Sequence, residues 1–330
     1  MTTKIGTAGT IVSSGVSGQF VAGWVLRNVV WIWLIALVAI FGLLNQYFFT
    51  VLNLQNILVQ ATVLGMMALA MSLPLLVAEI DLSVPANVGF SAAIGVLAHT
   101  EAGVPFALVP LVGIGVATLV GFFNAICITK MRMVSLIQTL SMMIILQGGL
   151  LALTRGRTLS GLPAGYIWIG QATLDGWPIM PLIFVLAIAG MYVLLRRMVL
   201  GRSIFAVGGN PAASAAAGIR VDRVKIASFT LSGFLAGVAG YLLASWQMAI
   251  TSNQGSSYLL YAIAAPIIGG VSVFGGRGSV LGVLGGVLLL TIIQVGLAIV
   301  SIPSFYVDMI GGFMIFIAVA IDAIRVRYFN

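Results

Sequence analysis

Charged side chains are scarce in this sequence: Asp, Glu, Lys and Arg make up 7% of its 330 residues, whereas 61% are hydrophobic. So few charges cannot cover a water-facing surface, which excludes an ordinary soluble protein and indicates a chain that lies in lipid. Cysteine occurs once, as Cys127 within an apolar run. A single cysteine excludes an internal disulfide framework and a multi-cysteine metal site, so we expect Cys127 to serve in packing.

Two further absences bear on function. The sequence lacks the Gly-x-x-x-x-Gly-Lys-Ser/Thr loop that binds nucleotide phosphates, so we do not expect this chain to hydrolyse ATP itself. The first residues lack the apolar core and cleavage site of a signal peptide, so we expect 1–23 to be a flexible cytoplasmic tail. The net charge of +8 comes from basic residues spread among apolar stretches, and we expect no nucleic-acid partner, bound cofactor or metal.

What the sequence does contain is a series of long apolar segments. Most approach the roughly 20 residues that a helix needs to cross the hydrocarbon core. The sequence therefore predicts an all-α polytopic membrane protein with about ten transmembrane helices, in one transmembrane domain over 24–330. The predicted segments are 25–44, 54–78, 82–99, 104–128, 133–153, 178–195, 226–248, 258–274, 280–301 and 305–324.

The distribution of Lys and Arg predicts the orientation, because cytoplasmic loops of membrane proteins carry the positive excess. Ten crossings with both termini in the cytoplasm leave only Arg155 and Arg157 outside. A count wrong by one helix would scatter the basic clusters across both faces. The thirteen basic residues placed inside are Lys4, Arg27, Lys130, Arg132, Arg196, Arg197, Arg202, Arg220, Arg223, Lys225, Arg277, Arg325 and Arg327.

Small residues and prolines indicate how these helices pack and where they break. Helices in lipid associate through close backbone approach, so glycines four residues apart, such as Gly233 and Gly237, predict tight helix contacts. A proline within an apolar segment removes a helix hydrogen bond and favours a kink or a break. Such prolines are Pro74, Pro85 and Pro266.

The polar stretch at 78–85 places two carboxylates between two apolar segments. A carboxylate near lipid needs water, a partner or a cavity. Asp81 or Ser83 suits the cap of the following helix, and a direct contact with a solute or an ion is the alternative. Glu79 is less easily explained as a cap, and we expect it to pair with a loop arginine such as Arg277 or to reach the inner aqueous face.

Neutral polar side chains recur within the apolar segments, where they can hydrogen-bond a passing hydroxylated solute or a neighbouring helix. Buried cations are absent from the segments, which disfavours an inorganic-ion channel. The candidates for the translocation path are Glu79, Asp81, Ser83, Asn124, Gln138, Gln147, Gln247 and Gln294.

The longest predicted cytoplasmic loop, 196–225, contains a well-delimited short helix. Asn210 suits the N-cap, Pro211 the first helical position and Gly218 the left-handed stop, with alanines between them. A helix of about two turns is marginal alone in water, so we expect it to dock against a partner. An interfacial helix without a partner is the alternative.

Several short motifs are specific when taken together, although each is weak alone. They are Asn53-Leu54-Gln55-Asn56-Ile57-Leu58, Ile80-Asp81-Leu82-Ser83-Val84, Gly201-Arg202, Gly208-Gly209-Asn210-Pro211-Ala212-Ala213, Gly218-Ile219, Ala262-Ile263-Ala264-Ala265, Ile268-Gly269-Gly270-Val271-Ser272 and Gly275-Gly276-Arg277-Gly278. Through these motifs, nearly the whole chain from about residue 28 resembles permease subunits of bacterial ribose/xylose-type ABC importers, a family that includes autoinducer-2 permeases.

The resemblance implies a permease dimer in the bacterial inner membrane, with ATP and Mg bound by a cytoplasmic ABC ATPase and a sugar or polyol delivered by a periplasmic solute-binding protein. It implies alternating access without covalent chemistry in this chain. Family members commonly carry glycine where Ala78, Glu79 and Pro85 stand here, so a cargo other than ribose is plausible. The residues that the resemblance implies for ATPase coupling are Gly208, Gly209, Asn210, Pro211, Ala212, Ala213, Ala216, Gly218 and Ile219.

Two other classes of function stay open at this stage. An ion-coupled secondary transporter would use Glu79 and Asp81 as a proton or sodium site near a broken helix. An intramembrane hydrolase would use Ser91 and the lone His99, but a separation of eight residues puts them about two turns apart on a straight helix, too far for direct contact.

Overall fold

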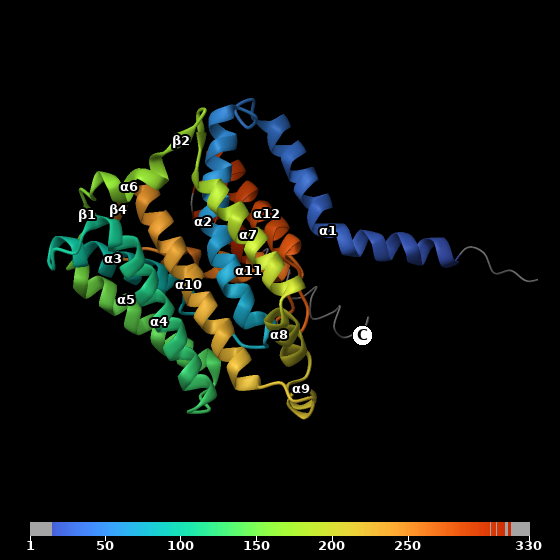
Figure 1. Ribbon diagram of the computed structural model, residues 1–330. Helices are drawn as coiled ribbons and strands as arrows, with labels where there is room; N and C mark the ends of the chain where they lie inside the picture. Colours follow the sequence, from blue (N-terminus) through green and yellow to red (C-terminus); the bar gives the residue numbers. More distant parts are fainter. Residues whose placement is uncertain (1–14, 304, 308, 314–315, 318–330) are drawn as a thin grey trace, which may run out of the picture.

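A computed structural model describes residues 15–303, 305–307, 309–313 and 316–317, and helices dominate this part of the chain (Figure 1). The α-helices are α1 Gly15–Leu44, α2 Val51–Leu76, α3 Val84–Thr100, α4 Val109–Thr129, α5 Ser135–Thr154, α6 Ala164–Gln171, α7 Met180–Arg197, α8 Val199–Gly209, α9 Pro211–Ala216, α10 Val221–Gln247, α11 Leu259–Ile268 and α12 Val280–Ile299. The shorter elements are the 3-10 helices η1 Phe106–Leu108 and η2 Ser256–Tyr258 and the strands β1 Leu159–Ser160, β2 Thr173–Leu174, β3 Trp177–Pro178 and β4 Ala249–Ile250.

Six of the described helical segments are long and apolar enough to cross a membrane: those of α2, η1 with α4, α5, α7, α10 and α12. The third and eighth predicted segments correspond to α3, with 17 residues, and to η2 with α11, both shorter than a full span. Half of the predicted segment 305–324 lies outside the described residues. The all-α membrane fold is therefore observed, while ten crossings and cytoplasmic termini stay predictions.

Local sequence explains where several of these helices begin. Thr50 and Ser279 are the N-caps of α2 and α12, and each side chain accepts a hydrogen bond from a backbone amide in the first turn. Of the prolines predicted to break helices, Pro85 lies in the first turn of α3, whereas Pro74 and Pro266 lie near the last residues of α2 and α11. The prolines thus mark helix ends.

The protein has two ends, each made of connections that are far apart in the sequence. One end holds α9, and we call it the α9 end; α8, the start of α10 and the connection between α4 and α5 lie there (Figure 1). Lys130 and Asp222 form an ion pair of 3.1 Å at this end, which joins the end of α4 to the start of α10. The connections predicted to be cytoplasmic at 129–132, 196–225 and 275–279 share this end.

The opposite end carries the β2–β3 hairpin, and we call it the hairpin end (Figure 1). The Gln55 side-chain amide donates a 2.7 Å hydrogen bond to the carbonyl of Gly176 there, and the Asn45 amide donates a 3.2 Å hydrogen bond to the carbonyl of Ile299. Strands β1 and β4 pair antiparallel, which joins the connection after α5 to the connection after α10. These connections are the ones that the ten-segment prediction places outside.

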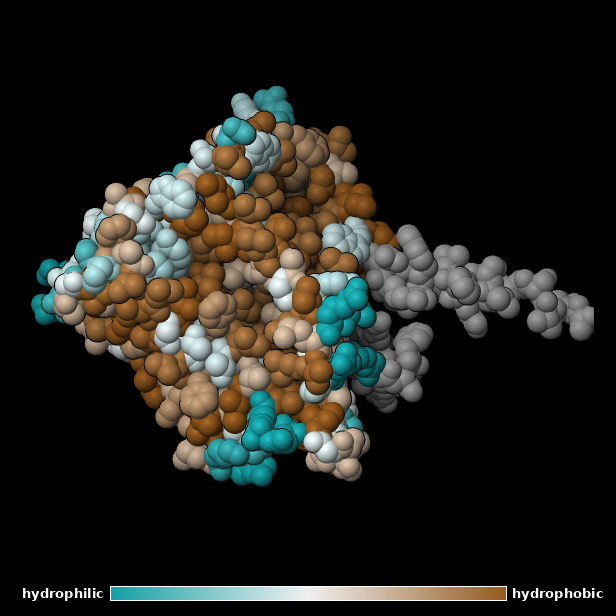
Figure 2. Space-filling model, in the orientation of Figure 1, coloured by the Kyte–Doolittle hydropathy of each residue, from teal (hydrophilic) through white to brown (hydrophobic). Residues whose placement is uncertain are grey.

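Helix α2 is the centre of the molecule, where it contacts α7, α10, α11 and α12. Its residues 61–76 are buried without interruption. A helix that is apolar on every side is shielded by other helices, which is the arrangement found here. On the face shown in Figure 2, the surface between the two ends is largely hydrophobic, and the most hydrophilic residues lie toward its margins.

Helices α4 and α10 pack through small residues, as predicted. A Cβ atom built on Gly233 would lie 2.4 Å from the carbonyl oxygen of Ala117, and one built on Gly121 would lie 2.3 Å from that of Phe229. Both distances are too short for a real side chain, so the two backbones approach each other only because both positions are glycine.

Candidate functional site

The segment from 196 to 225, predicted as a loop, is largely helical. Helix α7 continues to Arg197, and α8 and α9 follow before α10 begins at Val221. Ile204 and Val207 of α8 are three residues apart and fully buried against the core, so this part folds as an amphipathic helix. The glycines and the arginine of α8 interrupt its apolar pattern, so the local sequence does not reveal the amphipathic helix.

Helix α9 has the caps that the sequence predicts, over six residues. The Asn210 side chain accepts a hydrogen bond from the Ala213 amide at 2.9 Å, and Pro211 opens the helix. Gly218 has a φ of 84°, and its amide and that of Ile219 donate 3.0 Å hydrogen bonds to carbonyls of the last turn. This pairing is a Schellman stop, which glycine allows.

The surface of α9 is made of small, exposed side chains. Pro211, Ala212, Ala213, Ala216 and Gly218 are exposed, and so is most of the helix, whereas Ser214 is buried. We use the name coupling segment for residues 208–219, which include α9. The segment therefore presents a smooth, capped helix at the α9 end.

Three backbone segments meet where α8 ends, and glycines make the contact possible. A Cβ atom on Gly208 would lie 1.9 Å from the carbonyl oxygen of Leu76, the last residue of α2. The same carbonyl accepts a 3.0 Å hydrogen bond from the amide of Gly276. Gly275 has a φ of 81° and packs on the amide nitrogen of Ala78, which lies 2.7 Å from its built Cβ position. The coupling segment is thus in direct contact with the end of α2.

Residues 77–83, which we call the α2–α3 connection, lead from this glycine junction into a buried polar network. The Gln138 side-chain amide donates to the Asn124 oxygen at 3.3 Å, and the Asn124 amide donates to the Ser83 hydroxyl at 2.9 Å. The Ser83 hydroxyl then donates to the Asp81 carboxylate at 2.6 Å. All four side chains are buried. Four of the predicted path residues therefore form one hydrogen-bonded chain across α3, α4 and α5.

The cap predicted for the start of α3 is present, and it is shared by two residues: one occupies the N-cap position and the other accepts the hydrogen bond. Ser83 is the N-cap residue, but its hydroxyl does not bond a backbone amide. The Asp81 carboxylate instead accepts a 3.0 Å hydrogen bond from the backbone amide of Ser83. Asp81 thus has the structural contact expected of a capping side chain, and its contact with a solute or an ion stays a hypothesis.

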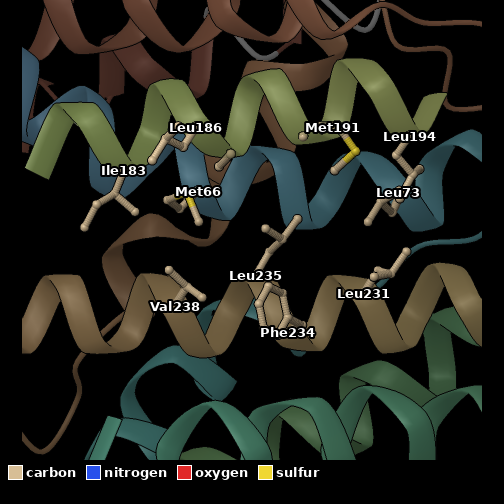
Figure 3. Close-up of a pocket in the computed structure, with 12 residues that line it drawn as sticks. Met66, Leu73, Ile183, Leu186, Met191, Leu194, Leu231, Phe234, Leu235 and Val238 are labelled. Atoms are coloured by element: carbon tan, nitrogen blue, oxygen red, sulfur yellow. The ribbon is translucent and has the colours of Figure 1, made fainter. Parts of the chain in front are cut away.

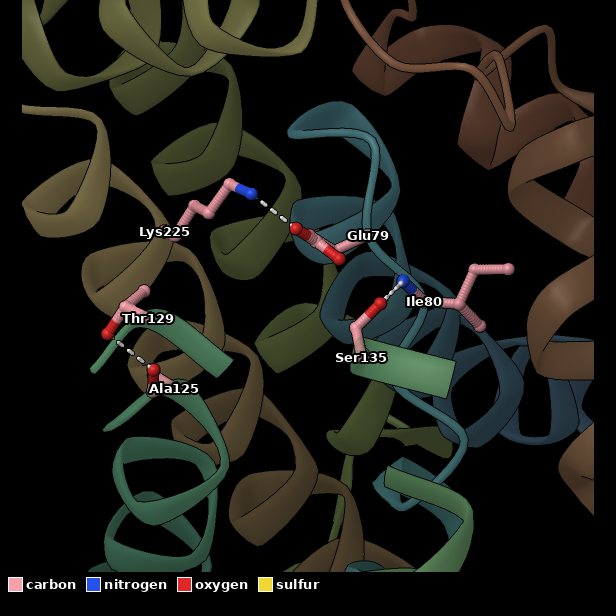
Figure 4. A network of polar contacts seen from close by, with 6 residues as sticks. All are labelled: Glu79, Ile80, Ala125, Thr129, Ser135 and Lys225. Carbon is pink, nitrogen blue, oxygen red and sulfur yellow. Dashed lines mark hydrogen bonds and ion pairs between the residues drawn. The ribbon is translucent and has the colours of Figure 1, made fainter. Parts of the chain in front are cut away.

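The α2–α3 connection is also fixed to the first turns of α5. The amide of Leu82 donates to the Thr139 hydroxyl at 3.1 Å, and the amide of Ile80 donates to the Ser135 hydroxyl at 3.4 Å. Figure 4 shows the Ile80–Ser135 contact beside the side chain of Glu79. These bonds satisfy backbone groups that a non-helical connection would leave unpaired.

Glu79 forms an ion pair with Lys225 of α10, and the two side chains point toward each other in Figure 4. Their exposed fractions are 16% for Glu79 and 21% for Lys225, so the pair is mostly shielded. Sequence reasoning named Arg277 as a partner for Glu79 and missed Lys225. The two residues are 146 positions apart, and no local signal connects them.

The other predicted path residues lie apart from the buried network. Gln147 is half-buried on α5, Gln294 is half-buried on α12, and Gln247 is exposed at the last residue of α10. Ser91 bonds within α3 to the carbonyl of Val88, and a His99 ring nitrogen lies 2.7 Å from the carbonyl of Val104. The described residues contain no group of three or more His, Cys, Asp or Glu that could hold a metal ion.

A groove of about 360 Å³ lies between α2, α7 and α10. Figure 3 shows Met66, Met191 and Phe234 among the side chains that line it, all of them apolar. Such a lining offers no hydrogen bonds to a hydroxylated solute, in contrast to the polar residues near the α2–α3 connection.

Comparisons with known proteins agree on one family. Residues 53–319 match the family described as branched-chain amino acid transport system / permease component. The chain is 36% identical to a ribose import permease protein of Bacillus subtilis (strain 168), over 88% of this chain and 90% of that one. It is 32% identical to the ribose import permease protein of Escherichia coli (strain K12), over 93% and 97% of the two chains.

An autoinducer 2 import system permease protein of Yersinia enterocolitica is 32% identical, over 86% of this chain and 78% of that one. No solved structure matches the chain. The similarity to these permease proteins covers all the elements that build the polar network and the coupling segment.

Proposed function

Because the chain belongs to this family of transport-system permease components, we propose that it is the permease subunit of a bacterial ATP-driven importer for a sugar or a similar polyhydroxylated solute. Ribose and autoinducer 2 are the cargoes in the names of the relatives. The chain is a multi-pass membrane protein, and we place it in the bacterial inner membrane. Its cargo class is a sugar or polyol, and the permease performs no covalent chemistry.

The observation that carries this proposal is the exposure of α9. Six residues form a helix that is capped at both ends and displays its alanines to the surrounding medium. An isolated helix of this length is unstable in water, so the caps at both ends of α9 favour a helix that binds a partner protein. We propose that the partner is a cytoplasmic ABC ATPase, which binds ATP and Mg and receives the coupling segment in a groove.

The contacts between the coupling segment and α2 could transmit a displacement of α9 to the helix bundle. The coupling segment touches the end of α2 at the Gly208–Leu76 contact, and α2 is the central helix of the bundle. Closure of the ATPase would push on α9 and displace α2 relative to its neighbours, because packed helices move as rigid bodies. We propose that this motion alternates access to a path between two permease subunits, and that a periplasmic solute-binding protein delivers the cargo.

The proposal is tested with the permease in proteoliposomes, together with its ATPase and solute-binding protein. A tryptophan at the exposed Ala213 is expected to abolish solute-stimulated ATP hydrolysis, because the added bulk blocks the docking of α9 without disturbing the bundle. The matched control is Ala102→Trp, at an exposed turn after α3. The control should keep both import and stimulated hydrolysis.

Two results would contradict the proposal. Unchanged stimulation in the Ala213→Trp variant would remove the coupling role of α9. Uptake driven by an ion gradient in vesicles without ATP would instead favour a secondary transporter that uses Glu79 and Asp81.

A further inference from the structure

The α2–α3 connection lies between two groups of helices and is held to each by a different kind of contact. On one side, hydroxyls of Ser135 and Thr139 hold its backbone to α5, and Asn124 of α4 holds Ser83. On the other side, the Glu79 carboxylate meets Lys225 near the start of α10. Figure 4 shows both kinds of contact on neighbouring residues.

Lys225 is close in sequence to the coupling segment. Helix α10 begins at Val221, three residues after the Gly218 stop of α9, and Lys225 lies in its second turn. A displacement of α9 therefore reaches Lys225 through a few residues of continuous backbone. The Gly208–Leu76 contact reaches the start of the same connection, three residues before Glu79.

An ion pair suits a contact between parts that move. A hydrogen bond is lost when its atoms separate beyond about 3.5 Å, whereas the attraction between opposite charges falls only inversely with distance. The pair is also shielded from water, with exposed fractions of 16% and 21%, so salt and solvent screen it less than an exposed pair. The attraction between Glu79 and Lys225 therefore persists when α10 shifts slightly relative to the connection.

We infer that Glu79 and Lys225 are positioning residues that couple the α2–α3 connection to the coupling segment during transport. The pair acts through the connection and its network, and Glu79 then contributes to transport without touching the solute. This inference rests on the proposed function, because it assumes that α9 receives work from an ATPase.

The test measures solute imported per ATP hydrolysed, in proteoliposomes with the complete importer. Glu79→Gln and Lys225→Gln should each lower this ratio about tenfold, a change within the usual range of coupling between sites. ATP hydrolysis without solute should persist, because the ATPase is intact. Lys225→Arg, which keeps the charge, and the double swap Glu79→Lys with Lys225→Glu should each recover the ratio to within about threefold of wild type.

The Lys130–Asp222 pair is the matched control, because it also joins the first turns of α10 to another part of the chain at the α9 end. Its side chains are 58% and 34% exposed, so Lys130→Gln should change the ratio less than about twofold. Membrane abundance of every variant separates lost coupling from failed folding.

The outcomes separate the inference from the proposed function. A wild-type complex without ATP-driven import overturns the proposed function and this inference with it. A working wild type with Glu79→Gln or Lys225→Gln at the wild-type ratio overturns the inference alone. A charge swap no better than the single variants does the same.

Discussion

At the scale of single residues, Asn124 shows why buried polar groups of this protein depend on one another. Its amide donates to Ser83 and its oxygen accepts from Gln138, so one side chain connects three helices. The side chains of Ser83, Asn124 and Gln138 are all buried. If Asn124 were replaced by an apolar residue, Ser83 and Gln138 would each lose a hydrogen-bond partner that water cannot replace. The polar groups that make these residues candidates for the translocation path also hold helices together through hydrogen bonds.

This dependence predicts that Asn124→Leu destabilises the protein by about 2 kcal/mol, because Ser83 and Gln138 each lose a partner inside the bundle. Thermal unfolding of the detergent-solubilised protein measures the change. The control is Ser141→Ala on α5, where an exposed hydroxyl bonds only to the carbonyl of Ile137 in its own helix. An Asn124 variant as stable as the control would show that the hydrogen-bonded chain contributes little.

At the scale of helices, the α4–α10 interface depends on the absence of side-chain atoms. Gly121 and Gly233 bring the two backbones together, and Gly237 extends the same face of α10 toward Ile114. In lipid, this close approach replaces the hydrophobic driving force that packs helices in water.

The Gly233→Ala variant tests this interface. The new methyl would meet the Ala117 carbonyl oxygen at 2.4 Å, so we expect a loss of about 1–3 kcal/mol from overpacking, despite the better helix propensity of alanine. Gly148→Ala on α5 is the same chemical change where a Cβ meets nothing within 4 Å. Calorimetry or thermal unfolding should find the control unchanged or more stable. A Gly233 variant with equal stability would refute tight packing at this position.

At the scale of the whole molecule, connections distant in sequence gather at two opposite ends (Figure 1). The α9 end collects the basic connections and the hairpin end collects β2, β3 and the β1–β4 pair. Under the ten-segment prediction, the connections at each end lie on one side of the membrane, and the distribution of Lys and Arg predicts that the α9 end faces the cytoplasm.

Labelling in intact cells tests that orientation. With Cys127 replaced by Ala, single cysteines at Ala215 of α9 and Asp175 of the β2–β3 hairpin provide exposed thiols at opposite ends. A membrane-impermeant maleimide should label the Asp175 variant from outside and the Ala215 variant only after permeabilisation. Labelling of both variants from the same side would contradict the two-ended topology.

Local patterns in the sequence explain much of this structure. Long apolar runs predict the helices, because a helix in lipid satisfies its backbone hydrogen bonds internally. Asn210, Pro211 and Gly218 predict the start and stop of α9, since capping involves only neighbouring residues. The motifs at 53–58 and 208–213 predict the family, which the comparisons establish.

Contacts between distant residues were decided by the tertiary structure alone. Asp81, Ser83, Asn124 and Gln138 meet in one chain, while Gln147, Gln247 and Gln294 lie elsewhere, although all are polar residues in or beside apolar segments. Glu79 pairs with Lys225 because α2 and α10 pack side by side, and no local pattern in the sequence indicates that these two helices are neighbours. The sequence by itself determined the helices, their caps and the family, since these depend on near neighbours and repeated motifs. Which polar side chains meet depends on the rotation and depth of each helix in the bundle, and only packing sets these.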